Sequence, residues 1–166
     1  MPQGFAARVT DPVQHPLPPV LSPGPGSPNV LIGFLPAWRG IPLAAVAALQ
    51  SAQATAVAAN NAAEAAAVAA APTPGAPAAR AAAEATKAAN LAAMSSAITS
   101  ASAGADIHMC ATPLPIPPHG PGVNITGSAT VSINFLTASR KGDTILEAIG
   151  PPNQIAMGLP TCTIGG

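Results

Sequence analysis

The sequence is poor in aromatic and charged side chains. Only 2% of its 166 residues are aromatic, and none is tyrosine. Charged residues make up 7%, whereas an average soluble domain has about 25%. Six basic and six acidic side chains cancel, so the chain lacks the positive charge that draws proteins to nucleic acid. It also lacks an aromatic platform on which bases stack. We therefore expect no nucleic-acid partner.

The sequence has few cysteines and does not predict an export signal. The two cysteines, Cys110 and Cys162, are too few for a disulfide framework. No basic segment followed by an apolar stretch opens the chain, so the sequence does not predict Sec export. Low charge combined with a mean hydropathy of +0.40 argues against simple disorder. This combination indicates a surface that a partner covers.

What the chain does contain divides it into three segments. Residues 1–42 and 105–166 are rich in proline, glycine and short β-branched runs, whereas half of residues 43–104 are alanine. The outer segments read as two parts of one β body, and the middle segment reads as an insertion. The sequence thus predicts a mainly β protein interrupted by an inserted alanine-rich helical hairpin.

An internal repeat supports the single β body. Each copy is a turn dipeptide followed by a short strand, in which two apolar residues two positions apart share one face. These residues are Val30 and Ile32, Val131 and Ile133, and Cys162 and Ile164. Three near-equivalent units predict a pseudo-threefold β body. The alternative is a coincidence of low-complexity turns. The copies occupy residues 26–33, 127–134 and 158–165.

The alanine-rich segment predicts two helices. Residues 43–71 and 78–102 lack internal proline and glycine, and the proline-rich residues 72–77 separate them. Val46, Val57 and Val68 are eleven residues apart and therefore share a face. Small side chains permit an antiparallel hairpin. A membrane-inserting hairpin is the alternative, because residues 42–63 are uncharged over the length of a bilayer span. The polar amides within that stretch favour the non-inserted hairpin.

The chemistry-bearing residues are few. Three histidines and one thiolate can complete a closed tetrahedral zinc site, and the candidate ligands are His15, His108, Cys110 and His119. The alternative is scattered surface histidines and a buried thiol. Cys162 occupies the position of Val30 and Val131 in the repeat, which predicts a core residue. A disulfide between the two cysteines is a weaker alternative.

Catalysis is not predicted. No histidine adjoins a serine or cysteine in a recognisable nucleophile motif. Four protein ligands would leave zinc no open position for water. Asp11, Asp106 and Asp143 are expected to act as turn caps rather than as metal-site residues.

Three segments resemble the Pro-Ala-Ala-Arg motif that names the PAAR-repeat family. The block around His108 and Cys110, together with Pro118-His119-Gly120, is also similar to that family. The resemblance covers residues 1–42 and 105–166. The motif variants are Ala6-Ala7-Arg8, Pro36-Ala37-Trp38-Arg39 and Ala138-Ser139-Arg140.

The resemblance implies a small conical β body with a pseudo-threefold axis. Such proteins cap and sharpen the trimeric β-helical (VgrG-type) spike of type VI secretion and related contractile injection systems. One copy would sit on each trimer and carry a structural Zn²⁺ ion held by His15, His108, Cys110 and His119. The chain departs from the family after Gly142-Asp143-Thr144, where other members often place a ligand and this chain has no histidine.

The resemblance also implies a location and further partners. The protein would reside in the bacterial cytoplasm before assembly and leave at the tip of the apparatus, meeting a membrane only by piercing it. An effector or adaptor could bind non-covalently through residues 43–104. Two other function classes stay open: a small zinc enzyme with three histidine ligands, and a membrane-associating protein that acts through the hairpin.

Overall fold

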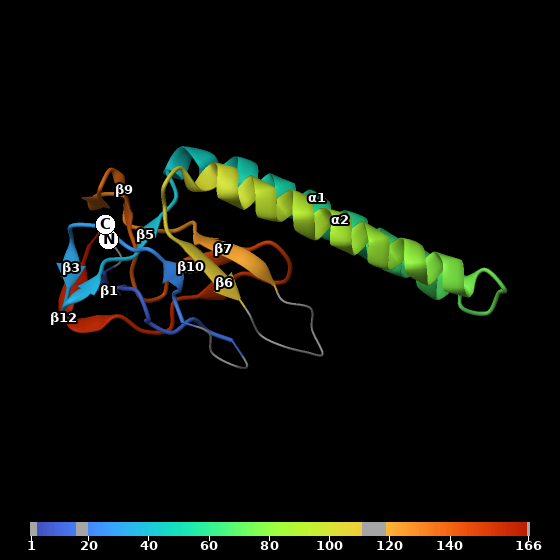
Figure 1. The fold of residues 1–166 in the computed structure, drawn as a ribbon, viewed down its shortest axis with the longest axis horizontal. Helices are drawn as coiled ribbons and strands as arrows, with labels where there is room; N and C mark the ends of the chain where they lie inside the picture. Colours follow the sequence, from blue (N-terminus) through green and yellow to red (C-terminus); the bar gives the residue numbers. More distant parts are fainter. Residues whose placement is uncertain (1–2, 16–19, 111–118, 166) are drawn as a thin grey trace.

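The computed structural model describes residues 3–15, 20–110 and 119–165. A body of short antiparallel strands carries two long antiparallel helices, which project from it (Figure 1). The helices contain 28 and 27 residues, whereas the longest strand has 6. The fold is therefore mixed α/β, not mainly β as the sequence suggested. The inserted helical hairpin is confirmed.

The helices begin and end where composition dictates. Helix α1 spans Leu43–Ala70 and helix α2 spans Ala76–Ser102. Alanine favours the helical backbone throughout, and Pro77 lies in the first turn of α2, where proline is tolerated. Ala103, directly after α2, caps the helix with a left-handed φ of 48°. Within the described residues, neither helix carries an apolar stretch long enough to cross a bilayer.

The strands form four small sheets. One sheet has five strands in the order β11-β10-β7-β6-β2, and a second has the order β5-β9-β8. The pairs β1-β12 and β3-β4 form the others. All their pairings are antiparallel. The strands are β1 Gly4–Ala6, β2 Pro23–Gly24, β3 Leu31–Ile32, β4 Leu35–Pro36, β5 Arg39–Gly40, β6 Ile107–Cys110, β7 Gly120–Asn124, β8 Ser132–Ile133, β9 Leu136–Ala138, β10 Thr144–Glu147, β11 Asn153–Gln154 and β12 Leu159–Ile164.

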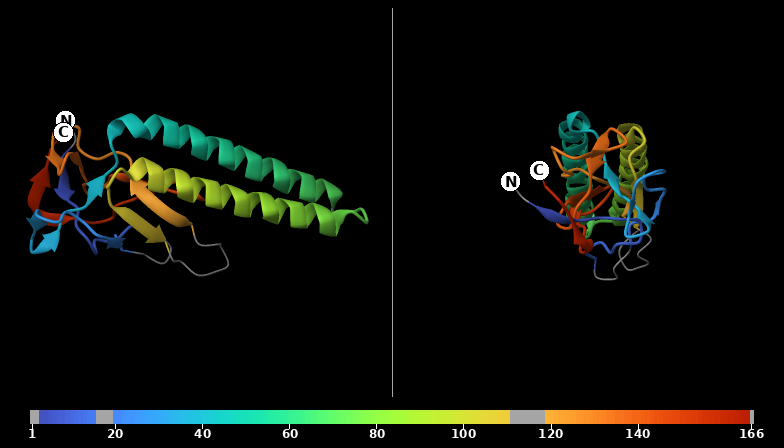
Figure 2. Two further views of the ribbon diagram at one scale, coloured as in Figure 1. Left: turned by 45° about the horizontal axis from the view of Figure 1, so that its top comes forward. Right: turned by 90° about the vertical axis from the view of Figure 1, so that its left-hand side faces the viewer.

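Among the residues that the structure describes, the part of the hairpin nearest the strands is the part that shares a core with the body. Leu49, Met94 and Ile98 are buried in one cluster with body residues that include Val123 and Leu146. The remainder extends beyond the strands (Figure 2). Val57 and Val68 are consequently 42% and 70% exposed. The valine face expected from the eleven-residue spacing is therefore not a buried face along its whole length.

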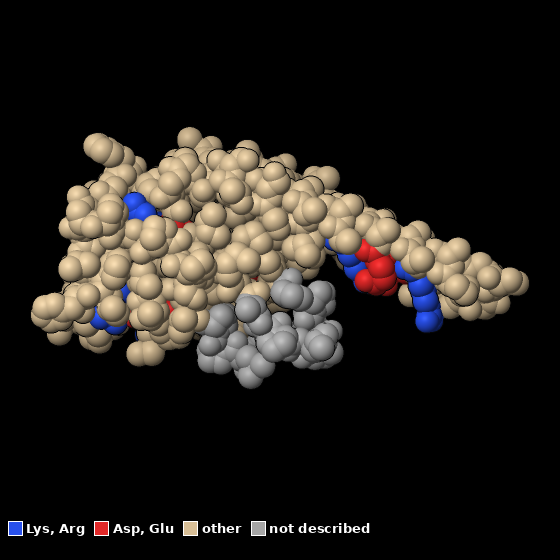
Figure 3. All heavy atoms as spheres, in the orientation of Figure 1, with Lys and Arg blue, Asp and Glu red and all other residues tan. Residues whose placement is uncertain are grey.

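The charged side chains of the hairpin gather on its projecting part (Figure 3). Lys87 makes ion pairs with Glu64 on the other helix and with Glu84 one turn before it. Exposed pairs of this kind contribute little to stability. Much of the remaining surface in this view carries no charge.

Three strand pairs of the body each contribute one isoleucine to a shared buried cluster. Ile32 pairs with Leu35 in β3-β4, Ile133 with Leu136 in β8-β9, and Ile164 with Gly4 in β12-β1. The third pair joins the two ends of the chain, which lie side by side (Figure 1). The three isoleucines form one buried cluster with three alanines. These alanines are Ala6, Ala37 and Ala138.

A closed ring of backbone hydrogen bonds links the same three units. The Ala7 amide donates to the Ser139 carbonyl (2.9 Å), Ser139 donates to Trp38 (3.1 Å), and Trp38 donates to Ala7 (2.9 Å). Each of these residues follows one of the buried alanines. Three chain segments far apart in sequence thus meet at one ring of backbone hydrogen bonds.

An arginine follows each member of the ring and pairs with an aspartate. In each case the arginine backbone N–H also donates to the same carboxylate, at 2.7–2.8 Å. In two pairs the aspartate lies three residues after the arginine, whereas in the third the whole hairpin separates them. The hairpin therefore occupies the place of a two-residue turn. The pairs are Arg8–Asp11 (2.9 Å), Arg39–Asp106 (2.8 Å) and Arg140–Asp143 (3.1 Å).

Candidate metal centre

The segments that leave the three aspartates converge on one buried site. His15, Cys110 and Glu147 each lie four residues after a paired aspartate. Cys110 and Glu147 are the last residues of β6 and β10. His119 lies next to Gly120, the first residue of β7. Segments from three distant parts of the chain therefore bring donor side chains to the same point.

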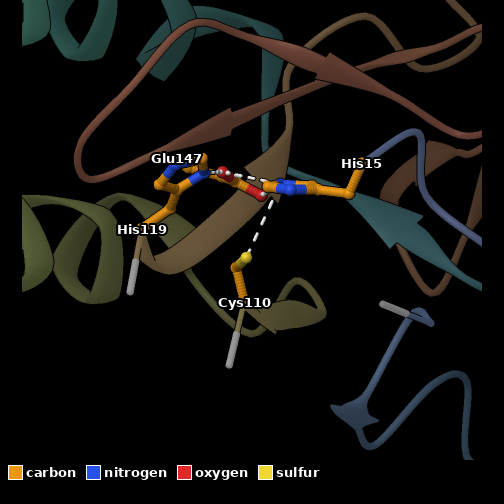
Figure 4. A group of neighbouring side chains, drawn as sticks. All are labelled: His15, Cys110, His119 and Glu147. Carbon is orange, nitrogen blue, oxygen red and sulfur yellow. Dashed lines mark hydrogen bonds and ion pairs between the residues drawn. The ribbon is translucent and has the colours of Figure 1, made fainter. Parts of the chain in front are cut away.

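Four side chains form the site, which we call the four-residue cluster: His15, Cys110, His119 and Glu147 (Figure 4). One donor atom from each lies within 4.8 Å of the others. Glu147 Oε2 is 2.6 Å from His119 Nδ1, and Glu147 Oε1 is 3.3 Å from His15 Nε2. Cys110 Sγ lies 3.5 Å from His15 Nε2. The donors are close enough to share one ion.

Because the cluster is buried, the negative charge of Glu147 needs a compensating positive charge or hydrogen bonds. The Glu147 side chain is 0% exposed and the His15 side chain 2%. A buried carboxylate is costly unless a positive charge or hydrogen bonds compensate it. A divalent cation would be neutralised by one thiolate and one carboxylate, and two neutral imidazoles would complete four donors. This mixture of nitrogen, sulfur and oxygen fits zinc.

Two further residues hold the donors in place. Asn153 Nδ2 lies 2.9 Å from His15 Nε2 and 3.0 Å from Glu147 Oε2, so this amide bridges two members of the cluster. Gly150 lies against the His119 ring, because a Cβ at this position would be 3.3 Å from two ring atoms. Its φ of +97° also requires glycine. The Asn153 contact with Glu147 and the Gly150 contact with the His119 ring can orient these two donors, whereas an ion bound to His15 Nε2 would displace the Asn153 amide from that nitrogen.

His108 lies beside the cluster but outside it. It is fully buried, and its Nε2 is 3.7 Å from Glu147 Oε1. Neither ring nitrogen has a hydrogen-bond partner within the described part of the chain. Burial lowers the pKa of His108 to about 4, so the ring is neutral at pH 7. His108 stands two residues after Asp106, where the other units place the core residues Val13 and Ile145.

The structure therefore brings together three of the four predicted ligands, and Glu147 supplies the fourth donor. The positions of histidine and cysteine in the sequence do not indicate this carboxylate. A usable signal was present, because counting four residues from Asp11, Asp106 and Asp143 reaches His15, Cys110 and Glu147.

Cys162 lies away from the four-residue cluster. It is half-buried on β12 and packs against the isoleucine cluster. Within the described residues no disulfide joins Cys110 and Cys162. The placement of Cys162 agrees with its position in the repeat.

The predicted turn caps have a more definite role. Asp11, Asp106 and Asp143 each bind the backbone N–H and the guanidinium of an arginine. They fix the point from which each ligand-bearing segment starts. They are two-sided clamps rather than simple turn residues.

Comparison with known proteins adds no relative. No family model matches the sequence, and no curated protein or solved structure shows significant similarity to it. The functional interpretation therefore depends on the residues and their geometry.

Proposed function

We propose that this chain is a structural cap for the end of a threefold-symmetric partner, namely the trimeric β-helical spike of a contractile injection apparatus. One observation carries the proposal: three strand pairs, three Arg–Asp pairs and three donor residues repeat around one backbone ring. A single chain with this pseudo-threefold arrangement can contact each of the three subunits of a trimer in a similar way. A monomer without internal symmetry cannot do so. The PAAR-like motifs belong to these same units.

The surface for the partner is the face that carries the turns of β3-β4 and β8-β9, which we call the turn face. Phe34 and Phe135 occupy equivalent places in the two turns and are 96% and 102% exposed. Both have positive φ, 68° and 66°, which costs an L-residue about 1–2 kcal/mol. Each turn has two central residues with positive φ, as a type I′ hairpin turn requires, and phenylalanine stands at the second of them, where glycine is the usual residue. Exposed apolar residues of this kind indicate a partner surface.

The turns are held together, so they act as one surface. Ser27 Oγ donates to Asn134 Oδ1 in the turn of β8-β9 (2.6 Å). Ser128 Oγ donates to the Gly165 carbonyl at the third strand pair. Leu159 in turn lies against Gly33 in the turn of β3-β4. Each unit thus braces the next, and strand edges of the partner can continue the pairing by β-augmentation.

The four-residue cluster would hold a structural Zn²⁺ ion. Zinc bound there would supply folding free energy by joining segments from all three units. His15, Cys110, His119 and Glu147 would fill a tetrahedral coordination shell, which leaves no open position for a catalytic water. A non-enzymatic, mechanical role follows: the ion stiffens a body whose core is small.

The helical hairpin would stay clear of the spike. It extends away from the turn face (Figures 1 and 2). An effector or adaptor could therefore bind its projecting part while the turn face is docked. In this proposal the protein assembles in the bacterial cytoplasm and is exported at the tip of the apparatus, where it meets a membrane by piercing it.

Co-purification with the cognate trimeric spike tests the proposal. We expect one copy per trimer, measured by native mass spectrometry. The double variant Phe34→Ser/Phe135→Ser should lose binding, whereas Val68→Ser on the projecting hairpin should bind normally. A folded, metal-loaded protein that does not bind the spike would overturn the proposal.

A further inference from the structure

The hairpin touches the segment that carries one of the candidate ligands. Gln53 on α1 lies one turn beyond the buried Leu49 and donates through Nε2 to two backbone carbonyls. The acceptors are Glu147 (3.1 Å) and Gly150 (3.4 Å). Glu147 belongs to the four-residue cluster, and Gly150 lies against the His119 ring. One side chain of the insertion thus fixes both ends of a short segment that borders two donors.

The second helix presses on the neighbouring donor. Gly120 follows His119, and a Cβ at Gly120 would lie 3.1 Å from Leu91 Cδ1 and 3.6 Å from Ser95 Oγ. Leu91 and Ser95 are both on α2, so this helix lies directly over the start of β7. The φ of Gly120 is +77°. Helix α2 can therefore pack closely on the β7 backbone, because Gly120 has no side chain to keep the two apart.

The two ligand-bearing segments are also joined to each other. Ile149 N donates to the His119 carbonyl (3.1 Å), and Ala148 N donates to the Pro121 carbonyl (3.0 Å). Residues 119–121 and 147–150 form one small unit between the helices and the cluster. A shift of either helix moves Glu147 and His119 together.

We propose that the helical hairpin is a structural part of the metal centre, with Gln53 as the positioning residue for Glu147 and His119. The inference rests on the metal centre of the proposed function and gives the insertion a role beyond cargo attachment. Because coupling is reciprocal, metal binding should tighten the docking of α1 as much as docking tightens the metal. In the described part of the chain the Gln53 side chain donates to Glu147 and Gly150 and not to the segments that carry His15 and Cys110, so the geometry of those two donors should change less.

Cobalt substitution tests this inference, because Co²⁺ reports the ligand field and the thiolate bond separately. Gln53→Met keeps the size of the side chain and removes its donor. The matched control is Gln50→Met. Gln50 and Gln53 line the same cleft between α1 and residues 149–152, and Gln50 makes no side-chain hydrogen bond within the described residues. The readouts are the visible d–d bands, the thiolate-to-cobalt charge-transfer band and Co²⁺ affinity by chelator competition.

We expect Gln53→Met to alter the d–d bands and to weaken Co²⁺ binding about tenfold, the lower end for residues that orient ligands. The charge-transfer band should persist, because Cys110 stays in place. Gln50→Met should match the unaltered protein. Unchanged bands and affinity in a folded Gln53→Met variant would overturn the inference. Failure of the unaltered protein to bind Co²⁺ would instead overturn the metal centre itself.

A measurement on the unaltered protein covers the case in which Gln53→Met does not fold. Backbone amide exchange of α1 around Gln53 should slow when Co²⁺ is added. Exchange in the projecting part, around Val68, should not change. Equal exchange of α1 with and without bound metal would contradict the coupling.

Discussion

At the scale of single residues, the key group is a carboxylate that water does not reach. Glu147 is fully buried beside three histidines, at 2.6 Å from His119, 3.3 Å from His15 and 3.7 Å from His108. Val13 and Ile145 are the core residues that correspond to His108 in the other two segments. The position of His108 is therefore that of a core residue rather than that of a metal donor. The geometry therefore favours Glu147 over His108 as the fourth donor.

Paired variants separate these two residues. Glu147→Gln keeps the shape of the side chain and removes its charge, so we expect bound zinc to weaken by more than about tenfold. His108→Leu should keep one zinc per chain, since this ring lies outside the four-residue cluster. Zinc content by elemental analysis and affinity by chelator competition measure both. The opposite result would restore the ligand set predicted from the sequence.

The two turn phenylalanines are expected to lower the stability of the fold while providing contacts for the partner. Phe34→Gly removes the backbone strain of a positive φ and should raise the free energy of unfolding by about 1 kcal/mol. The same change should weaken binding to the spike. Urea unfolding and co-purification give the two values. Leu31→Ser is the control, because Leu31 is 61% exposed and has no positive φ: it should reduce binding without the gain in stability.

At the scale of elements, the hairpin has two parts with different duties. The part nearest the strands supplies Leu49, Met94 and Ile98 to a core shared with the body. The projecting part has small side chains, a few charges and exposed valines. Removing residues 43–104 as a whole would therefore expose the body's core, and it would not test cargo attachment cleanly.

Two methionines, one on α2 and one on the body, test whether the hairpin shares the body's core. Met94 is 3% exposed and Met157 is 56% exposed. Met94→Ala should lower the free energy of unfolding by about 2–4 kcal/mol, because it leaves a cavity between α2 and the strands. Met157→Ala should change it by no more than about 0.5 kcal/mol. Equal effects in urea unfolding would mean that the hairpin does not share the body's core.

Truncation beyond the packed part isolates the attachment role. Asn60 and Asn90 are joined across the two helices at 2.7 Å, so residues 62–88 can be replaced by a short glycine-rich turn just beyond this contact. We expect zinc content and spike binding to be retained, and binding of an effector or adaptor to be lost. Retention of cargo binding by this variant would move the attachment site to the body.

The elements were predictable to the extent that local composition decides them. Alanine content and the proline-rich break define both helices, and the repeated isoleucines mark the core of the strand pairs. The buried face of the helices was predictable only in part. Val46 packs against the shared core as its face predicts, but the surrounding alanines do not indicate where along the helices this packing stops. Packing against the body decides that face, which explains why Val57 and Val68 are exposed. Glu147 was missed for a related reason: a single carboxylate has no spacing of its own, and only the three-unit comparison reveals it.

At the scale of the whole molecule, stability depends on a junction between distant segments. His15, Cys110, His119 and Glu147 come from both sides of the insertion. Metal that binds only the folded chain stabilises it by about 4 kcal/mol when its concentration is a thousand times the Kd. We therefore expect a strong chelator to lower the Tm by several degrees in thermal unfolding. Cys110→Ser should melt lower and respond weakly to the chelator, and an equal response would argue against metal at this site.

The position of the hairpin between Arg39 and Asp106 also bears on how the chain folds. Closing a flexible loop of this length would cost about 4 kcal/mol in chain entropy. Two antiparallel helices return the chain to its starting point, so residues 40–105 form a rigid bridge whose ends already lie together. Helix formation is local and fast, and it can bring Arg39 toward Asp106 before the strands pair. The insertion thereby shortens the effective chain that the small β body must organise.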